Sequence, residues 1–329
     1  MRVLFIGGTG VISSACSQLA IERGIDLYLL NRGESTRPIP QGARVLRGDI
    51  RNRASVQSAL ADLKFDAVVD WIVFTPEQAQ ADLDLFRGRT DQYLMISSAS
   101  VYQKPLASLP ITESTPLANP YWDYSRNKIA CEQVLMQAYR AEQFPVTIVR
   151  PSHTYDQTML PLHGRYTMVA RMRRGKPVIV HGDGTSLWTL THHRDFAKGL
   201  VGLLGNPHAV GDAFQITSDE ILTWNQIYQI VARAAGTEAK IVHVPSDDIR
   251  AYDQNWGDSL LGDKAHSVIF DNSKIKRLVP DYAATIPFAQ GAREIIAWHD
   301  ADPARHVIDA RIDQLIDQII AARQNRLRG

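Results

Sequence analysis

The sequence predicts an α/β fold, a doubly wound parallel sheet followed by a smaller C-terminal α/β domain. Over residues 1–150, short apolar runs alternate with segments of helix length, as in sheets whose parallel strands are joined by helices. After Pro151 the predicted elements are shorter, and glycine and proline become more frequent. We therefore divide the chain into residues 1–155 and residues 156–329, and expect some later segments to return to the first domain.

The first unit of the chain has the pattern of a strand, a tight turn and a helix. Residues 3–6 are apolar, residues 7–10 are Gly-Gly-Thr-Gly, and apolar side chains recur at helical spacing over residues 12–20. Gly24 stands where this helix would end, and a second apolar run follows at residues 27–30. These features together predict a βαβ unit.

The remaining elements are predicted from the same two patterns. Further strands are expected at residues 44–46, 67–73, 92–96 and 146–149. Helices are expected between them, for example at residues 53–63 and 78–86. Near the C-terminus we predict an amphipathic helix that docks on the body of the protein through Val307, Ile308, Ile312, Leu315, Ile316, Ile319 and Ile320.

Composition and charge exclude several classes of protein. A hydrophobic fraction of 45% and a charged fraction of 22% exclude a disordered chain. The net charge of +1 provides no overall field that would attract a polyanion. No apolar run approaches the roughly 18 residues that span a membrane. Cys16 and Cys131 form neither a disulfide framework nor a metal-binding pattern, so we expect a cytoplasmic protein without a membrane anchor.

The turn after the first predicted strand is suited to phosphate binding. Gly7 permits a tight turn, and Gly10 lets a phosphate approach backbone amides at a helix N-terminus. Ser13 stands where a third glycine is usual. Glycines in such turns can also serve backbone conformation alone. The position one strand from the N-terminus favours a dinucleotide cofactor over that alternative.

The ends of the second and third strands bear on which dinucleotide binds. An acidic residue at the end of the second strand would repel a 2′-phosphate, but this chain has Asn31 there. Arg32 can pair with a 2′-phosphate, so the sequence favours NADP. Because Asn31 can also hold a ribose and Arg32 can be solvated, we write the cofactor as NAD(P). Asp49 and Ile50 are expected beside the adenine.

Tyr124 and Lys128 are candidates for acid–base chemistry. A spacing of four residues places the phenol and the ammonium on one face of a helix. A nearby positive charge lowers the pKa of a tyrosine, as a general acid/base requires. An isolated Tyr-x-x-x-Lys pattern is common by chance. Here a serine-rich strand end at residues 97–100 precedes it, which favours a functional site.

Several motifs together carry a resemblance to a known family. Besides the glycine turn and the Tyr124–Lys128 pair, they are Gly48-Asp49-Ile50, Ser97-Ser98-Ala99-Ser100-Val101-Tyr102, Val149-Arg150-Pro151-Ser152, Gly182-Asp183-Gly184 and Asp271-x-Ser273-Lys274. In this order, over nearly the whole chain, the sequence resembles extended short-chain dehydrogenases/reductases of the NAD-dependent epimerase/dehydratase family. The resemblance implies a Rossmann-type first domain and a substrate-binding second domain.

The resemblance also implies an activity. Ser98 would hydrogen-bond the reacting hydroxyl, Tyr124 would move its proton, and Lys128 would bind the nicotinamide ribose. The reaction would be reversible hydride transfer between a carbinol carbon and a nicotinamide. It would give an epimerase if the transient ketone is reduced on its other face, and a dehydrogenase if the ketone leaves. The resemblance further suggests a homodimer formed through the helix that bears Tyr124.

Two sets of residues are predicted to form the binding sites. The cofactor set is Gly7, Thr9, Gly10, Val11, Ile12, Asn31, Arg32, Asp49, Ile50, Ile72, Lys128, Pro151 and His153. The substrate set is Phe74, Ser98, Ser100, His153 and Trp188. Residues 151–153 are expected to approach both the nicotinamide and the substrate.

The sequence departs from the family where the substrate is chosen. Dehydratases carry an Asp-Glu pair at the positions of Ala99 and Ser100, so we expect no dehydratase activity. Trp188 stands where nucleotide-sugar members carry a diphosphate-binding arginine, and residues 259–261 provide no second one. An aromatic ring such as Trp188 either stacks on a sugar or packs in the core. We predict a carbohydrate-like substrate without a nucleotide; a nucleotide-sugar 4-epimerase is the alternative.

Two other kinds of site have weaker support. Some atypical relatives resemble RNA-binding proteins, and this chain has one basic cluster: Arg165, Arg171, Arg173, Arg174 and Lys176. Such a run is usually a solvated helix face, and retention of the Ser98, Tyr124 and Lys128 set argues against a purely binding role. His192 and His193 suggest a metal site, but adjacent histidines in a strand point to opposite sides. We therefore predict no metal.

Overall fold

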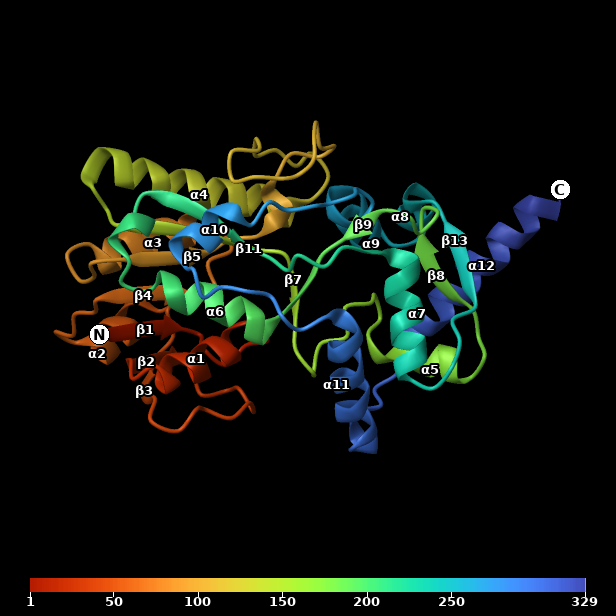
Figure 1. The fold of residues 1–329 in the computed structure, drawn as a ribbon, viewed down its shortest axis with the longest axis horizontal. Helices are drawn as coiled ribbons and strands as arrows, with labels where there is room; N and C mark the ends of the chain where they lie inside the picture. Colours follow the sequence, from red (N-terminus) through yellow and green to blue (C-terminus); the bar gives the residue numbers. More distant parts are fainter. Residues whose placement is uncertain (329) are drawn as a thin grey trace.

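The computed structural model describes residues 1–328 and contains a seven-stranded parallel sheet (Figure 1). Its strand order is β11-β6-β5-β4-β1-β2-β3. The strands are β1 (Arg2–Ile6), β2 (Asp26–Asn31), β3 (Arg44–Arg47), β4 (Ala67–Asp70), β5 (Tyr93–Ile96), β6 (Val146–Pro151) and β11 (Asp212–Ile216). The order reverses between β1 and β4, where doubly wound sheets form a binding crevice. The predicted α/β fold is confirmed.

Helices cover both faces of this sheet because its strands are apolar on both sides. Along β1, Val3 and Phe5 belong to one buried cluster, and Leu4 and Ile6 belong to another. The first cluster is closed by α1 (Ser13–Glu22), α6 (His193–Leu203) and α10 (Ser273–Leu278). The second is closed by α2 (Arg53–Leu60), α3 (Pro76–Phe86) and α4 (Asp123–Glu142).

A second group of elements lies beside the sheet and has its own apolar core (Figure 1). Its helices are α5 (Tyr166–Arg173), α7 (Trp224–Ala234), α8 (Ser246–Tyr252), α9 (Gln254–Ser259), α11 (Phe288–Asp300) and α12 (Ala310–Arg328). Its paired strands are β7 (His153–Tyr155) with β10 (Leu190–His192), β8 (Val178–His181) with β13 (Ile241–Val244), and β9 (Leu187–Trp188) with β12 (Leu222–Thr223). Short helical turns are η1 (Ala99–Val101), η2 (Pro207–Ala209), η3 (Leu260–Lys264) and η4 (Pro303–Arg305).

The chain passes between the two groups more than once. Strand β11 and helices α6 and α10 follow residue 155 in sequence, yet they pack in the sheet layers. The division at residue 155 remains a prediction about domains. This crossing brings segments that are distant in sequence to the same edge of the sheet.

Several predicted elements differ in their bounds; the helix predicted at residues 53–63, for example, ends at Leu60. Strand β4 ends at Asp70 rather than residue 73, because the Asp70 carboxylate accepts a hydrogen bond from the Ile72 amide at 2.7 Å and turns the chain there. The C-terminal helix begins at Ala310, so the prediction that Val307 and Ile308 dock is wrong; they are 70% and 44% exposed. The other predicted apolar positions of this helix are buried in the second core. None of the helices within residues 1–328 is both long and apolar enough to cross a membrane.

Candidate active site

The glycine turn joins β1 to α1 at the edge where the carboxyl ends of the strands meet. Gly7 and Gly8 have φ angles of +110° and +79°, which L side chains rarely adopt. A Cβ atom on Gly8 would lie 2.6 Å from Leu29 Cδ2. Of the atoms that the structure describes, only the Ser13 hydroxyl would lie within 4 Å of a Cβ on Gly10. The space beside Gly10 is therefore open, so a ligand can approach this turn closely.

Ser13, at the position of the usual third glycine, is buried and hydrogen-bonds to the turn. Its hydroxyl accepts a hydrogen bond from the Gly10 amide at 2.7 Å, and the residue is 2% exposed. Ser17, one turn further along α1, donates to the Gly8 carbonyl at 2.7 Å. These two hydroxyls tie the turn to the helix that follows it.

The loop after β2 contains two arginines, one in an exposed ion pair and one in an ion pair with a buried aspartate. Arg32 pairs with Glu34 at 2.8 Å, and both side chains are exposed, so its guanidinium can exchange partners. Arg37 instead reaches across to Asp156, with 2.5 Å between Nη1 and Oδ2. The side chain of Asp156 is 3% exposed. Arg37 is therefore a structural link between this loop and the segment after β7, whereas the Arg32–Glu34 pair is exposed to solvent.

Hydroxyl groups connect the end of β5 to the start of α4. Ser98 caps η1 and accepts a hydrogen bond from the Ser100 amide at 3.2 Å. The two hydroxyl oxygens of Ser98 and Ser100 lie 2.9 Å apart, and Ser125 donates to Ser100 Oγ at 2.8 Å. Because Ser125 follows Tyr124 in α4, this chain of hydroxyls holds the strand end and the tyrosine in register.

Tyr124 is half-buried in the first turn of α4. Its ring lies 4.8 Å from the ring of Trp122. Burial raises the pKa of Tyr124 above the ordinary value of 10.0; a hydrogen-bonding interaction with Ser98 opposes this rise, and the carboxylate of Asp263 adds to it. The net shift is upward because burial outweighs the opposing interaction, and the effect of Lys128 on this pKa stays a prediction. The phenol keeps its proton at neutral pH.

Lys128 lies one turn along α4 from Tyr124, and its side chain is buried. Its Nζ donates to the Val73 carbonyl at 2.5 Å and to the Ile96 carbonyl at 2.8 Å. The same atom is 5.9 Å from the centre of the Tyr124 ring and 4.6 Å from that of Phe74. Burial lowers the pKa of Lys128 to about 8. The ammonium thus lies at the ends of β4 and β5, beside the switch point of the sheet.

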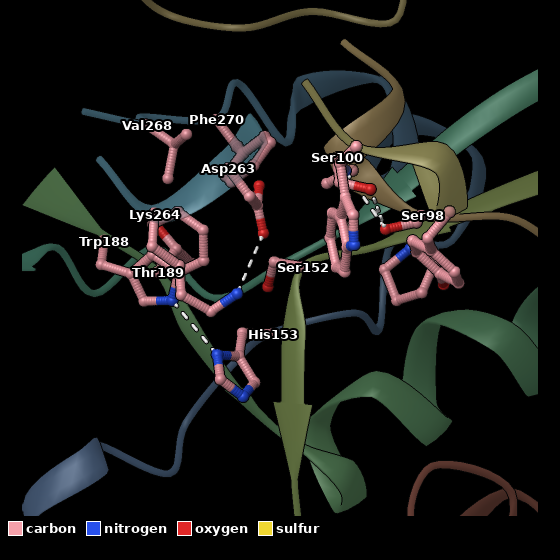
Figure 2. Close-up of a pocket in the computed structure, with 14 residues that line it drawn as sticks. Ser98, Ser100, Ser152, His153, Trp188, Thr189, Asp263, Lys264, Val268 and Phe270 are labelled. Atoms are coloured by element: carbon pink, nitrogen blue, oxygen red, sulfur yellow. Dashed lines mark hydrogen bonds and ion pairs between the residues drawn. The ribbon is translucent and has the colours of Figure 1, made fainter. Parts of the chain in front are cut away.

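A cavity of about 230 Å³ brings several of the predicted residues together. Figure 2 shows side chains from the sheet edge on one side and from the second group of elements on the other. The predicted lining residues are Ser98, Ser100, Tyr124, Pro151, His153 and Trp188. The others are Ala99, Trp122, Ser152, Thr189, Asp263, Lys264, Val268 and Phe270. The cavity therefore combines a tyrosine, two serines and several rings in one site.

Asp263 and Lys264 are site residues that the sequence prediction omitted. They belong to η3, a π-helical turn, and such turns occur frequently at functional sites. Lys264 Nζ lies 3.7 Å from the Asp263 carboxylate (Figure 2). It also lies 5.4 Å and 5.8 Å from the ring centres of Trp122 and Trp188. Two adjacent charged residues carry no periodic signal, so only the fold identifies them.

His153 and Trp188 form a neutral pair in the cavity wall. The indole Nε1 of Trp188 donates to His153 Nδ1 at 3.4 Å (Figure 2). Burial lowers the pKa of His153 to about 3, so its imidazole is uncharged at neutral pH and can accept this bond. Trp188 is 3% exposed and therefore both packs in the core and borders the cavity.

Other predicted residues do not border this cavity. Phe74 is 45% exposed, and its ring lies over Lys128 Nζ outside the lining. Ile72 is tied to the end of β4 by its amide, which donates to Asp70 Oδ1 at 2.7 Å. The predicted cofactor residues that lie along the carboxyl edge of β1 to β4, away from the lining, are Gly7, Thr9, Gly10, Val11, Ile12, Asn31, Arg32, Asp49, Ile50 and Ile72.

The paired histidines lie at the junction of β10 and α6. His192 Nε2 is 3.1 Å from a carboxylate oxygen of Glu294, and its ring contacts that of His193. Across residues 1–328, no three histidine, cysteine, aspartate or glutamate side chains gather as a group that could hold a metal ion.

Comparisons with known proteins identify related chains. The family model described as "NAD dependent epimerase/dehydratase family" matches residues 3–217. The chain is 26% identical over 287 residues to 2′-dehydrokanamycin reductase of Streptomyces kanamyceticus, which covers 86% of this chain and 80% of that protein. It is 27% identical over 261 residues to the chloroplast stem-loop binding protein of 41 kDa b of Arabidopsis thaliana, covering 74% and 65%.

A solved structure shows the same fold. UDP-glucose 4-epimerase from Bifidobacterium longum, in complex with NAD+ and UDP, superposes with a TM-score of 0.74 at 20% identity, covering 92% of this chain and 99% of that chain. The family match includes the glycine turn, the serine-rich strand end, Tyr124 and Lys128. The predicted resemblance is confirmed: the chain belongs to the NAD-dependent epimerase/dehydratase family.

Proposed function

We propose that the protein is an NAD(P)-dependent oxidoreductase or epimerase that acts at a carbinol or keto carbon of a carbohydrate-like substrate. The observation that carries this proposal is that Ser98 and Tyr124 line one cavity together with Pro151 and His153. This places a proton-carrying phenol and a hydroxyl donor against a space large enough for one sugar ring. Lys128 lies on the same helix, behind the phenol.

Tyr124 and Ser98 have different roles in the proposed reaction. Tyr124 donates its proton to a substrate carbonyl oxygen during reduction and takes it back during oxidation. Ser98 hydrogen-bonds that same oxygen and holds it beside the phenol. The raised pKa of Tyr124 keeps the phenol protonated at neutral pH, which supports the reductive direction. A bound nicotinamide supplies or accepts the hydride.

The glycine turn fits a dinucleotide, because the space beside Gly10 is open and α1 begins at Ser13. On binding, a phosphate oxygen would replace Ser13 Oγ as the acceptor of the Gly10 amide. Arg32 supports a preference for NADP, since its guanidinium is exposed and pairs with Glu34, which is exposed too. Lys128 would hold the nicotinamide ribose. Because Ala99 and Ser100 lack carboxylates, we propose no dehydratase activity.

The cellular compartment and the oligomeric state are also part of the proposal. Buried free thiols at Cys16 and Cys131 support a reducing compartment such as the cytoplasm. We propose a homodimer formed through α4, where Met136, Gln137 and Arg140 line a surface groove beside β11.

RNA binding is a second candidate function because the Arabidopsis relative is named for binding a stem-loop. The basic cluster offers little support for it. Arg171 is fully buried, with ion pairs of 2.5 Å and 2.6 Å to Asp313 and Asp317, and Arg173 pairs with Asp300. A salt-dependent affinity for an RNA hairpin would be needed to favour this function.

The test of the enzymatic proposal is the reduction of a panel of keto sugars, followed through the absorbance of NADPH and NADH. Replacing Tyr124 by Phe removes the proton donor, and we expect the rate to fall by roughly 10² or more. Tyr121→Phe is the matched control, because Tyr121 contacts His266 and does not line the cavity. If the Tyr124→Phe variant reduced a substrate as fast as the wild type, the proposed mechanism would be wrong.

A further inference from the structure

A second cavity adjoins the active-site cavity. Its volume is about 240 Å³, and the first has about 230 Å³. His153 and Lys264 line both, so these two side chains form the boundary between them. The rest of its lining comes from the segment before α5, from β8, and from α7, α9 and η3. The two cavities are therefore neighbours that share one wall.

The second cavity is lined mainly by rings and apolar side chains. The imidazole of His163 stacks on the indole of Trp256, with ring centres 4.0 Å apart and planes 3° apart. The ring centre of Trp224 lies 5.4 Å from that of Trp188, which lines the first cavity. Aromatic side chains therefore line both cavities, and the rings of Trp188 and Trp224 contact each other between them. Such surfaces bind flat or ring-shaped groups by stacking.

The charges around the second cavity are few and partly satisfied. Its lining includes two cationic side chains, Arg165, which is exposed, and Lys264, whose ammonium lies 3.7 Å from Asp263. Burial lowers the pKa of both His163 and His181 to about 4, so neither is charged at neutral pH. Diphosphates are usually held by bidentate guanidinium groups at close range. Arg165 is the one guanidinium in the described lining, and most of the wall consists of rings and apolar side chains, which favour an uncharged ring.

The boundary between the cavities is rigid. The carbonyl oxygen of Lys264 accepts hydrogen bonds from Trp224 Nε1 at 3.2 Å and Ser186 Oγ at 3.1 Å, and it lies 2.9 Å from His181 Nε2. Three side chains from different elements thus fix the backbone at this point. The Lys264 ammonium and the neighbouring Asp263 carboxylate lie at this shared wall, where they can bind hydroxyl or ether oxygens.

We propose that the second cavity binds the uncharged ring of an aglycone, while the carbinol-bearing sugar of the same glycoside lies beside Tyr124. This inference rests on the proposed function and names its substrate class. The substrate is a glycoside with a ring-shaped, uncharged second part, and Trp256 and His163 form the platform on which that part stacks.

The test is a set of binding titrations followed by tryptophan fluorescence of the full-length protein. The probes are the methyl and phenyl β-glycosides of glucose, galactose and mannose, together with UDP-glucose. We expect at least one phenyl glycoside to bind about tenfold more tightly than its methyl counterpart and more tightly than UDP-glucose. The inference is overturned if no phenyl glycoside binds, if the phenyl group adds nothing, or if UDP-glucose binds best.

Two variants locate the effect. Met159→Trp fills the second cavity from a half-buried loop position, and Trp256→Leu removes the stacking platform. Each should lose the phenyl preference and leave binding of the methyl glycoside unchanged. Trp298→Leu is the control, because Trp298 packs on Arg305 outside both cavities. If circular dichroism shows that Trp256→Leu does not fold, Met159→Trp still tests whether the phenyl group binds in the second cavity.

The outcomes separate this inference from the proposed function. If keto sugars are reduced in a Tyr124-dependent way but the phenyl group adds no affinity, only the second-cavity inference fails. If the phenyl group adds affinity that Met159→Trp removes but no keto sugar is reduced, the proposed function fails.

Discussion

Replacing Glu132 by Gln should destabilise the protein more than most single changes. Glu132 on α4 and Arg150 on β6 have side chains that are 4% and 6% exposed, and they pair through two bonds of 3.1 Å and 2.6 Å. Ser97 donates a third bond to the same carboxylate at 2.5 Å. The neutral amide leaves a buried guanidinium without its counter-charge, which costs about 3–5 kcal/mol. The expected loss in free energy of unfolding is of that size.

Urea unfolding at pH 7, followed by circular dichroism, measures this loss. Arg150→Met on its own should also destabilise, because it leaves the carboxylate buried and unpaired. The double variant Glu132→Gln/Arg150→Met removes both charges and should recover part of the loss, so the two effects should not add. A loss below about 1 kcal/mol for Glu132→Gln, or strictly additive losses, would refute the argument that this pair is buried and coupled.

Three further predictions concern the turn, the lysine and the cofactor. Gly8→Ala places a Cβ 2.6 Å from Leu29 Cδ2 at a φ of +79°, and we expect a loss of at least about 1 kcal/mol in urea unfolding together with weaker cofactor binding; an unchanged midpoint would contradict this. Folding lowers the pKa of Lys128 from 10.5 to about 8, so between these values the unfolded chain binds more protons and stability should rise with pH. Lys128→Met should remove that rise, and a wild-type stability that falls over this range would oppose the assignment. Arg32→Ala should weaken NADP binding about tenfold in calorimetric titrations and leave NAD unchanged, whereas equal losses for both would argue against a 2′-phosphate contact.

The placement of the candidate catalytic residues could be predicted because their signals are local. The spacing of Tyr124 and Lys128 places them one helical turn apart, and the serine-rich segment marks the end of a strand. The glycine turn follows an apolar strand directly, so its place at the carboxyl edge of the sheet follows from the pattern alone. These features depend on residues only a few positions apart, so they can be recognised without knowledge of the fold.

The substrate site could be predicted only in part. Trp188 was predicted as a lining residue, but Asp263 and Lys264 were not, because an adjacent pair of charges has no pattern that distinguishes a site from a surface. Phe74 was predicted to bind substrate, yet its ring lies over Lys128 outside the cavity lining. The outcome at each position depends on which distant segment packs beside it.

The sequence by itself determined the fold class and the kinds of reactive group, since apolar periodicity and short spacings carry that information. Only the tertiary structure decided the direction of the Tyr124 pKa shift, which depends on burial and on Asp263, far away in sequence. It also decided the shape of the two cavities that meet at His153 and Lys264. Burial, electrostatic distance and cavity shape arise from contacts between segments more than one hundred residues apart, and no local pattern encodes them.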